Sequence, residues 1–310
     1  MINGIINVYK EQGFTSHDVV AKLRGILKMK KIGHTGTLDP DAVGVLPVCL
    51  GNATKVCDLL TDKDKTYETV LLLGRTTDTQ DISGKTLRMS EARFTKDEIA
   101  EAVRSHVGNL MQVPPMYSAL KVNGKKLYEL AREGIEVERK ARPITVYSID
   151  ILSVDEVQTD DMSITQTEVR MRIHCSKGTY IRTICHDIGE KLGCGGCMKE
   201  LTRTQVANFS IKDSLTLKDI EFLRDQEKLN DVIVSVEQIF SDVKKVVVAK
   251  EHSKLIYNGN TFTKRHLQDK IDNSELSRVR VYDHNGTFIG IYEFDQEKKC
   301  FKVVKMFLNS

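Results

Sequence analysis

The chain has 310 residues, of which 40% are hydrophobic and 29% are charged, and its formal net charge at pH 7 is +3. These proportions are ordinary for a globular protein and exclude a disordered or fibrous chain. Its apolar runs fall well short of the ~20 residues that span a membrane, and the N-terminus lacks the basic start of a secretory signal. We therefore expect a cytoplasmic protein with no membrane partner.

The N-terminal part of the chain predicts a strand followed by a helix. Residues 4–9 have the apolar composition of a buried strand. Ser16 is expected to cap the helix, whose apolar stripe has helical spacing and consists of Val19, Val20, Leu23, Ile26 and Leu27. Basic side chains with no acid among them follow, namely Lys22, Arg24, Lys28, Lys30 and Lys31. Such a patch fits either phosphate binding or a solvated helix face.

The glycine-rich stretch from Lys31 to Pro47 contains the first candidate catalytic residue, Asp39. Pro40 disfavours the helical conformation for the residue before it, so Asp39 should lie at a sharp bend. The mostly apolar residues 43–48 predict a buried wall beside this carboxylate. An acid held on a rigid bend beside apolar surface is typical of a catalytic group. In isolation, however, this stretch favours the simpler interpretation of a turn or helix-cap aspartate.

Strands and helices alternate through the middle of the chain. Apolar and alternating patterns predict strands at 66–73, 143–152 and 167–175. In the polar loop 74–84, Asp78 and Asp81 fit a turn better than a cation site, because no third carboxylate has metal-ligand spacing. Thr95 and Glu98 form a capping box and predict the start of a helix.

A charged segment at residues 121–142 has few large apolar side chains, so we expect it to extend from the core as an insertion. Further along, residues 181–192 predict a helix with Arg182 in its first turn. A positive charge there opposes the helix dipole. We therefore expect a carboxylate partner for Arg182.

The seven cysteines are scattered, and without an export signal they favour free thiols. Cys194 and Cys197 have the C-x-x-C spacing of some zinc and redox sites. A zinc site also needs a second ligand pair at diagnostic spacing, and the sequence has none. We expect no metal and no cofactor.

The C-terminal part of the chain, from about residue 244, changes to short strands. Asn-Gly dipeptides at 258–259 and 285–286 are typical of hairpin turns. We therefore expect two domains, residues 1–243 and a small β domain at residues 244–310.

Six motifs occur in the order and approximate spacing of the TruB family of tRNA pseudouridine synthases, which the chain resembles along essentially its whole length. They are Gly33–Pro47, Lys65–Tyr67, Thr77–Asp81, Pro114–Ala119, Gly178–Arg182 and Leu201–Arg203. The resemblance implies an α+β fold with a mixed or antiparallel sheet flanked by helices and a small C-terminal domain of the PUA type. It favours a catalytic role for Asp39 over the turn interpretation.

The resemblance also implies the reaction. A uridine in the tRNA T-loop, conventionally position 55, is isomerised to pseudouridine when its glycosidic bond is cut and C5 of the base bonds to the ribose. Because a base inside a folded loop must be extruded first, the site should be a narrow pocket reached from a basic surface. No metal, redox group or other cofactor is implied.

By the same resemblance, Asp39 is the essential carboxylate, acting as a nucleophile at the sugar or base or initiating glycosidic cleavage. Arg182 pairs with it, and Tyr67 stacks on the base and serves in proton transfer. Tyr180 and Leu201 complete the pocket, although core packing is an alternative for both. Three further residues are expected to bind substrate, namely Lys31, Gly33 and His34 at the rim. The insertion at 121–142 is expected to grip the RNA.

Two other functions are compatible with the same residues. One is the guide-RNA-dependent catalytic subunit of the same superfamily, and the other is a chaperone that binds and remodels the tRNA elbow. We favour a stand-alone, monomeric enzyme that acts on the T-arm of tRNA and requires no protein partner.

Overall fold

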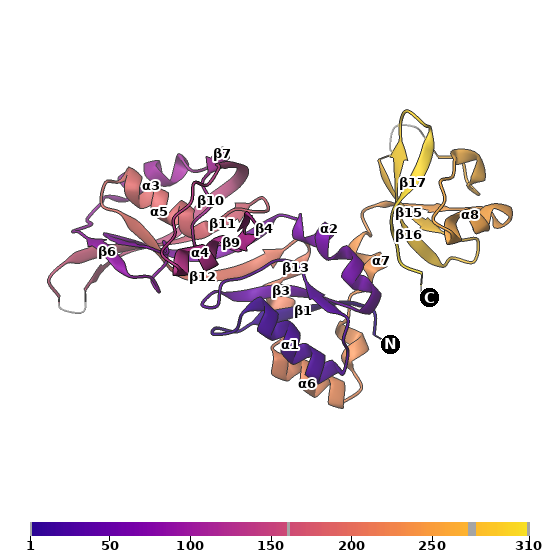
Figure 1. The fold of residues 1–310 in the computed structure, drawn as a ribbon, viewed down its shortest axis with the longest axis horizontal. Coiled ribbons are helices and arrows are strands. Elements are labelled where there is room, and N and C mark those ends of the chain that lie inside the picture. Colours follow the sequence, from indigo (N-terminus) through magenta and orange to yellow (C-terminus); the bar gives the residue numbers. More distant parts are fainter. Residues whose placement is uncertain (1, 160–161, 272–276, 309–310) are drawn as a thin grey trace.

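The computed structural model describes residues 2–159, 162–271 and 277–308 of the chain. A large mixed sheet with helices against it forms most of the molecule, and a small β domain follows at the C-terminal end (Figure 1). This is the α+β architecture expected from the sequence.

The large sheet has the strand order β1-β3-β12-β4-β11-β10-β7, with β2 beside β3 and β13 beside β12. Only β3 and β12 run parallel among its pairings in the described residues. The strands are β1 (Gly4–Lys10), β2 (Ile32–His34), β3 (Val43–Leu50), β4 (Lys65–Leu73), β7 (Gly108–Gln112), β10 (Arg142–Gln158), β11 (Thr165–Cys175), β12 (Gly196–Val206) and β13 (Phe209–Ser210).

The α-helices are short apart from α1 and α5. They are α1 (Ser16–Leu27), α2 (Cys57–Thr61), α3 (Lys96–Arg104), α4 (Leu127–Arg132), α5 (Ile181–Lys191), α6 (Leu217–Asp225), α7 (Val236–Ile239) and α8 (Ser253–Tyr257). Five 3-10 helices occur in the described residues, at Gly51–Val56, Ile211–Asp213, Leu229–Val232, Lys250–His252 and Lys264–His266.

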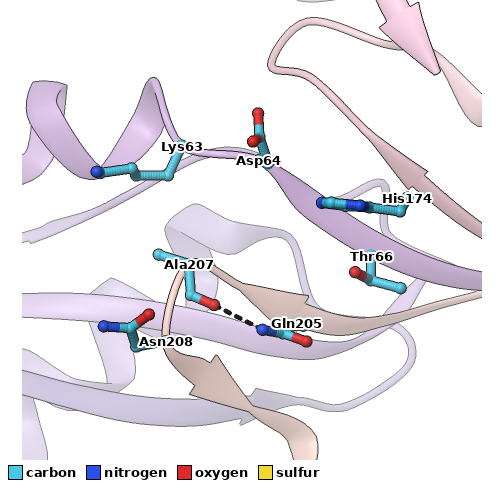
Figure 2. A pocket seen from close by; sticks show the side chains of 7 residues that line it. All are labelled: Lys63, Asp64, Thr66, His174, Gln205, Ala207 and Asn208. Atoms are coloured by element: carbon cyan, nitrogen blue, oxygen red, sulfur yellow. Dashed lines mark hydrogen bonds between the residues drawn. The ribbon is translucent and has the colours of Figure 1, made fainter. Parts of the chain in front are cut away.

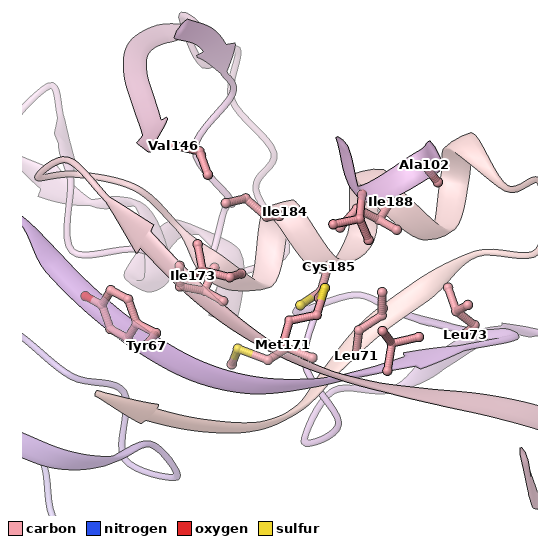
Figure 3. Packing of buried hydrophobic residues seen from close by; sticks show 14 of the residues in the cluster. Tyr67, Leu71, Leu73, Ala102, Val146, Met171, Ile173, Ile184, Cys185 and Ile188 are labelled. Atoms are coloured by element: carbon pink, nitrogen blue, oxygen red, sulfur yellow. The ribbon is translucent and has the colours of Figure 1, made fainter. Parts of the chain in front are cut away.

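One face of β4, β10 and β11 is covered by α3 and α5 (Figure 3). Side chains alternate between the faces of a strand, so every second residue of β4 and β11 faces these helices. The cluster includes Tyr67, Leu71, Met171, Ile173, Ile184, Cys185 and Ile188. On the opposite face the strands carry charged cross-strand pairs such as Arg172–Glu68, whose atoms are 2.8 Å apart. This half of the sheet therefore buries only one face.

The other half of the sheet is buried on both faces. Helices α1 and α6 pack with Ile6, Val8, Leu46 and Val48 on one side. On the other side Ile5, Val45 and Cys49 pack with Leu60, Phe209 and Phe240. Since successive side chains of β1 and β3 point to opposite faces, both sets are buried by the same two strands.

The start of α1 corrects one prediction. Thr15, not Ser16, is the N-cap, and it forms a capping box with Asp18. Ser16 is the first helical residue, and its Oγ accepts a hydrogen bond from Leu38 N at 3.0 Å. The sequence offers two adjacent hydroxyl residues, and local pattern alone does not distinguish the cap from the one used in a long-range contact. The predicted capping box of Thr95 and Glu98 is present at the start of α3.

The loop expected at 74–84 is more ordered than predicted. It contains β5 (Arg75–Thr77), which pairs with β6 (Thr86–Met89) across a tight turn. The turn itself is held by the carboxylate of Asp81, which accepts hydrogen bonds from Thr79 and Ser83.

The predicted insertion lies between two neighbouring strands. Gln112 at the end of β7 pairs with Arg142 at the start of β10, so residues 113–141 leave the sheet and return to it at one place. They contain β8 (Lys121–Val122), β9 (Lys125–Lys126) and α4. Leu127 and Leu130 are buried, while most of residues 133–141 are exposed.

The C-terminal sheet has the order β14-β15-β16-β17, formed by Lys244–Val247, Arg278–Tyr282, Phe288–Asp295 and Cys300–Met306. It has its own core, which includes Val246, Val281, Tyr292 and Phe301. Asn285-Gly286 forms the predicted hairpin turn, but Asn258-Gly259 ends α8 instead, with Gly259 at φ +68°. The division at 243/244 stays a prediction. No helix in the described part of the chain is long and apolar enough to cross a membrane.

Candidate active site

Asp39 lies on the loop between β2 and β3, and backbone contacts on both sides of it fix this loop. Leu38 N donates to Ser16 Oγ, and Thr35 N donates to Pro47 O at 3.2 Å. Pro40 O accepts from Lys10 Nζ at 3.0 Å and from Gly13 N at 3.0 Å. The bend predicted before Pro40 is therefore held by α1 and β1 and not by the loop alone.

Arg182 joins two carboxylates in this site. Its Nη2 lies 2.6 Å from Asp39 Oδ2, and its Nη1 lies 3.3 Å from Asp81 Oδ2. The Arg182 side chain is 7% exposed and that of Asp39 is 38% exposed, so part of the Asp39 carboxylate remains accessible. The carboxylate partner expected for Arg182 is therefore present twice.

Asp81 was interpreted from the sequence as a turn residue only. It holds the β5–β6 turn through Oδ1 and also contacts Arg182 through Oδ2. The available signal was its place in the motif Thr77–Asp81, together with the unbalanced charge of Arg182.

The neighbours of Asp39 have opposite effects on its pKa. Burial raises the pKa of Asp39 above its ordinary value, and the charge of Asp81 adds to this rise. Arg182 lowers that pKa by ion pairing, and Lys10 lowers it by its charge. Arg182 thus favours the ionised form of Asp39 in surroundings that otherwise favour the neutral acid.

Tyr67 lies on β4 and belongs to the core beneath α5 (Figure 3), close enough to Asp39 for the charge of that carboxylate to act on its phenol. Burial raises the pKa of Tyr67 to about 12, and the charge of Asp39 contributes to the rise. The phenol is therefore neutral and able to donate a proton or a hydrogen bond at pH 7.

Arg203 is a second site residue that the sequence reasoning missed, although it ends one of the six motifs. It is buried, its Nε donates to Val45 O at 2.7 Å, and its Nη2 donates to Gly36 O at 3.4 Å. Its charge lowers the pKa of Tyr67, against the effect of burial. Arg203 thus connects the glycine-rich loop to β4 and β12.

Tyr180 directly precedes α5, two residues before Arg182, and is half-buried. Burial raises the pKa of Tyr180, and the charges of Arg182 and Asp39 also act on it. Leu201 on β12 is half-buried and packs against the core that contains Tyr67. Arg182 therefore contacts Asp39 directly, the charge of Asp39 reaches Tyr67 and Tyr180, and Leu201 lies against the core that contains Tyr67.

His34 ends β2 and is held by two neighbours. Its Nδ1 accepts a hydrogen bond from Gly36 N at 3.3 Å, and its ring packs edge-on against His17 at 5.2 Å. Burial lowers the pKa of His34, which favours the neutral imidazole. Lys31 and Gly33 have other contacts: Lys31 Nζ donates to Asn52, and a side chain at Gly33 would meet Cys57. Their binding roles stay predictions.

A separate polar cavity of about 230 Å³ lies elsewhere on the sheet (Figure 2). Its lining includes Thr66, His174 and Gln205, which pair across β11, β4 and β12. Thr66 points to the opposite face of β4 from Tyr67, because neighbouring side chains alternate. The cavity is therefore distinct from the site around Asp39.

In the described residues no group of three or more histidine, cysteine or acidic side chains could hold a metal ion. The thiol of Cys194 donates to the backbone oxygens of Gly189 and Gly195. Burial raises the pKa of Cys197 to about 11, which disfavours the thiolate that zinc or redox chemistry needs. The geometry around Asp39 instead supports chemistry by a carboxylate and a neutral phenol.

Comparisons with known proteins find a family-model match over residues 24–241 and relatives that cover 99% of the chain. Residues 24–181 match the TruB family pseudouridylate synthase N-terminal domain, and residues 182–241 match the tRNA pseudouridylate synthase B C-terminal domain. The tRNA pseudouridine synthase B of Lachnoclostridium phytofermentans is 55% identical over 99% of this chain and 100% of its own length. That of Clostridium perfringens strain 13 is 45% identical over 99% of each chain.

Among solved structures, the chain is similar to one in a Cbf5-Nop10-Gar1 complex. The TM-score is 0.72 at 26% identity, and the match covers 98% of this chain and 85% of that chain. A chain in an H/ACA RNP bound to a substrate RNA has the same fold, with a TM-score of 0.71 at 24% identity over 99% of this chain and 85% of its own.

Proposed function

This chain belongs to the TruB family and is an enzyme that makes pseudouridine in tRNA, and from that premise we propose that its target is a T-loop uridine, conventionally position 55. The observation that carries the catalytic part of the proposal is the 2.6 Å ion pair of Arg182 and Asp39, whose carboxylate charge also acts on Tyr67. It supplies an ionised, oriented carboxylate next to a neutral phenol.

Asp39 is the catalytic carboxylate in this proposal. It acts as a nucleophile on the sugar or the base, or it initiates cleavage of the N1–C1′ glycosidic bond. The freed uracil turns, C5 bonds to C1′, and the proton lost from C5 is balanced by one gained at N1. Arg182 keeps Asp39 ionised and holds its orientation through a charge-assisted hydrogen bond.

The target base has to leave the folded T-loop before it reaches Asp39. Tyr67 stacks on the extruded uracil and takes part in the proton transfer, for which its neutral hydroxyl is suited. Tyr180 and Leu201 form the remaining walls. Extrusion costs unpairing energy, which contacts to the surrounding RNA must offset.

Three surface features would supply those contacts. The exposed lysines Lys28, Lys30 and Lys31 follow α1 and lead into β2, which ends at His34 on the rim of the site. Residues 121–142 would grip the T-arm from the side of β7 and β10. The C-terminal β domain would add an RNA contact of the PUA type. The protein acts as a monomer without a guide RNA or a protein partner in this proposal.

The test uses unmodified tRNA transcript with the wild type and with Asp39→Asn, a nearly isosteric change. Pseudouridine is located by carbodiimide treatment and primer extension. We expect complete modification at one T-loop uridine by the wild type, none by Asp39→Asn, and equal tRNA binding by both. Activity of Asp39→Asn would overturn the catalytic role of Asp39. Modification elsewhere in the tRNA would overturn the T-loop assignment.

Omitting or adding a guide RNA separates the stand-alone enzyme from the guide-dependent alternative. Modification that requires the added RNA would favour the latter. Sedimentation of the active protein tests whether it is a monomer.

A further inference from the structure

A buried glutamine, Gln112, holds the backbone of Tyr180 with both ends of its amide. Gln112 Oε1 accepts a hydrogen bond from Tyr180 N at 2.8 Å, and Gln112 Nε2 donates to Tyr180 O at 3.0 Å. The two residues are 68 positions apart in the sequence, and Gln112 is only 6% exposed. An amide with both groups satisfied by one residue fixes the position and the direction of that residue.

The place of this contact gives it a specific consequence. Tyr180 is the N-cap of α5, and its side chain makes no capping hydrogen bond. Gln112 therefore orients the residue from which α5 starts. Arg182, which holds Asp39, lies in the first turn of the same helix. A shift of Tyr180 would move both a wall of the pocket and the partner of the catalytic carboxylate.

The same contact ties the pocket to the insertion. Gln112 is the last residue of β7, and the chain leaves the sheet directly after it. Ser118, six residues on, is 4% exposed and lies beside the hydroxyl of Tyr180, where it opposes the rise in the pKa of that phenol. The Ser118 Oγ lacks a partner with hydrogen-bond geometry among the described residues. The segment 113–141 thus begins directly after the residue that holds the Tyr180 backbone, and its Ser118 lies beside the Tyr180 hydroxyl.

We propose that Gln112 is a positioning residue for pseudouridine formation, which holds Tyr180 and the start of α5 in register with Asp39 and couples them to the RNA-gripping insertion. The inference rests on the proposed function, because it assigns Tyr180 to the pocket of the extruded base. Gln112 does not touch the substrate. It acts on the geometry of groups that do.

Gln112→Met tests this role, because methionine keeps the length and volume of the side chain but makes neither hydrogen bond. We expect the single-turnover rate on saturating tRNA to fall roughly tenfold to a hundredfold, as small misplacements of reacting groups do. The dissociation constant for tRNA should change by less than about twofold, because the phosphate contacts are intact. The loss is therefore expected in the chemical step and not in binding.

Gln166→Met is the matched control. Gln166 is also buried, at 4% exposure, and its Nε2 donates to Gly74 O at 3.0 Å on the side of the sheet away from Tyr180. Its replacement should also lower the unfolding temperature, because a buried amide hydrogen bond is lost, and should leave the single-turnover rate within about twofold of the wild type. Equal rate losses in both variants would mean that a buried amide matters only for stability, and would overturn the proposal.

Gln112→Glu adds a second measurement, the pH dependence of the rate, which a purely structural role of Gln112 would leave unchanged. The carboxylate accepts from Tyr180 N but repels Tyr180 O, whereas the protonated acid donates to that oxygen as the amide does. The rate of this variant, divided by that of the wild type at each pH, should therefore rise as the pH falls. A flat ratio, or a wild-type rate for Gln112→Met, would contradict the inference. If the wild type itself leaves the T-loop unmodified, the proposed function has failed instead.

Discussion

At the scale of single residues, the ionisation of Asp39 depends on Arg182 and Asp81, whose effects on its pKa have opposite signs. Both contact the same guanidinium, at 2.6 Å for Asp39 and 3.3 Å for Asp81. Arg182 lowers the pKa of Asp39 and Asp81 raises it, against a background of burial that also raises it. One arginine is thus shared by two carboxylates, and its charge favours the ionised form of Asp39.

The pH profile of kcat/KM tests this balance. The proposed mechanism requires an ionised Asp39, so the rate should fall as the pH falls through the pKa of this residue. Arg182→Gln removes the charge that lowers this pKa, so the acidic limb should move to higher pH, with a rate loss of roughly a hundredfold at neutral pH. Asp81→Asn removes the charge that raises it, so the limb should move to lower pH.

Steady-state rates on tRNA transcript, measured from neutral pH down to the lowest pH at which the protein stays folded and binds tRNA, give the acidic limbs of the wild type and both variants. A shift of the acidic limb in the same direction for both variants would contradict the proposed balance. If both substitutions merely loosened Arg182, the pKa of the limb would rise in each case.

At the scale of secondary-structure elements, the sequence predicted what depends on local pattern. The stripe of α1, the capping box of α3 and the alternation of β11 are repeated in the structure, because each reflects the periodicity of one element. The predicted N-cap of α1 was wrong by one residue. Ser16 instead contacts Leu38, and a contact over 22 positions leaves no local signal. The parallel pairing of β3 with β12 also could not be predicted from local pattern.

Gly44 shows the steric constraint where β3 pairs with β12. It pairs with Arg203 in the parallel contact of β3 and β12, and its φ is +107°. A Cβ there would lie 2.3 Å from Arg203 O, which is backbone and cannot move aside. Gly44→Ala should therefore destabilise the fold by about 3 kcal/mol or more.

Gly25 in the exposed face of α1 is the control. Nothing lies within 4 Å of a Cβ added there, so Gly25→Ala should stabilise the protein by about 0.5–1 kcal/mol through helix propensity. Urea unfolding of both variants measures the two effects. Similar unfolding midpoints would show that the close approach at Gly44 is relieved by movement of β12.

At the scale of the whole molecule, the site is assembled from segments far apart in the sequence. Asp39 and Arg182 were both identified as candidates, because resemblance to a family supplied what pattern could not. Asp81, Gln112 and Arg203 were missed as site residues, since their roles consist of contacts over 68 to 167 positions. Asp81 and Arg203 lie in two of the six motifs, but the motifs do not give their contact partners, which only the folded chain brings together.

The C-terminal domain also joins the rest of the molecule through specific contacts. Phe307 and Ile291 pack with Phe240 of the main domain. Lys305 lies 2.9 Å from Asp58. The basic surface that would meet tRNA can therefore extend over both parts of the chain, and its share of the binding free energy can be measured.

Salt dependence gives that share for the patch of Lys28, Lys30 and Lys31. All three side chains are exposed, and phosphate contacts release about 0.9 counterions each. Changing all three to glutamine should reduce the slope of log K against log salt by about two to three, and should weaken binding most at low salt. Lys85, Lys96 and Lys191 are exposed as well, and they lie directly before β6, at the start of α3 and at the end of α5. These elements lie away from α1 (Figure 1). Changing these three lysines to glutamine alters the net charge by the same amount and should leave the slope almost unchanged. Identical slopes for the two triple variants would mean that net charge alone governs binding, and the residues after α1 would then be a solvated helix end.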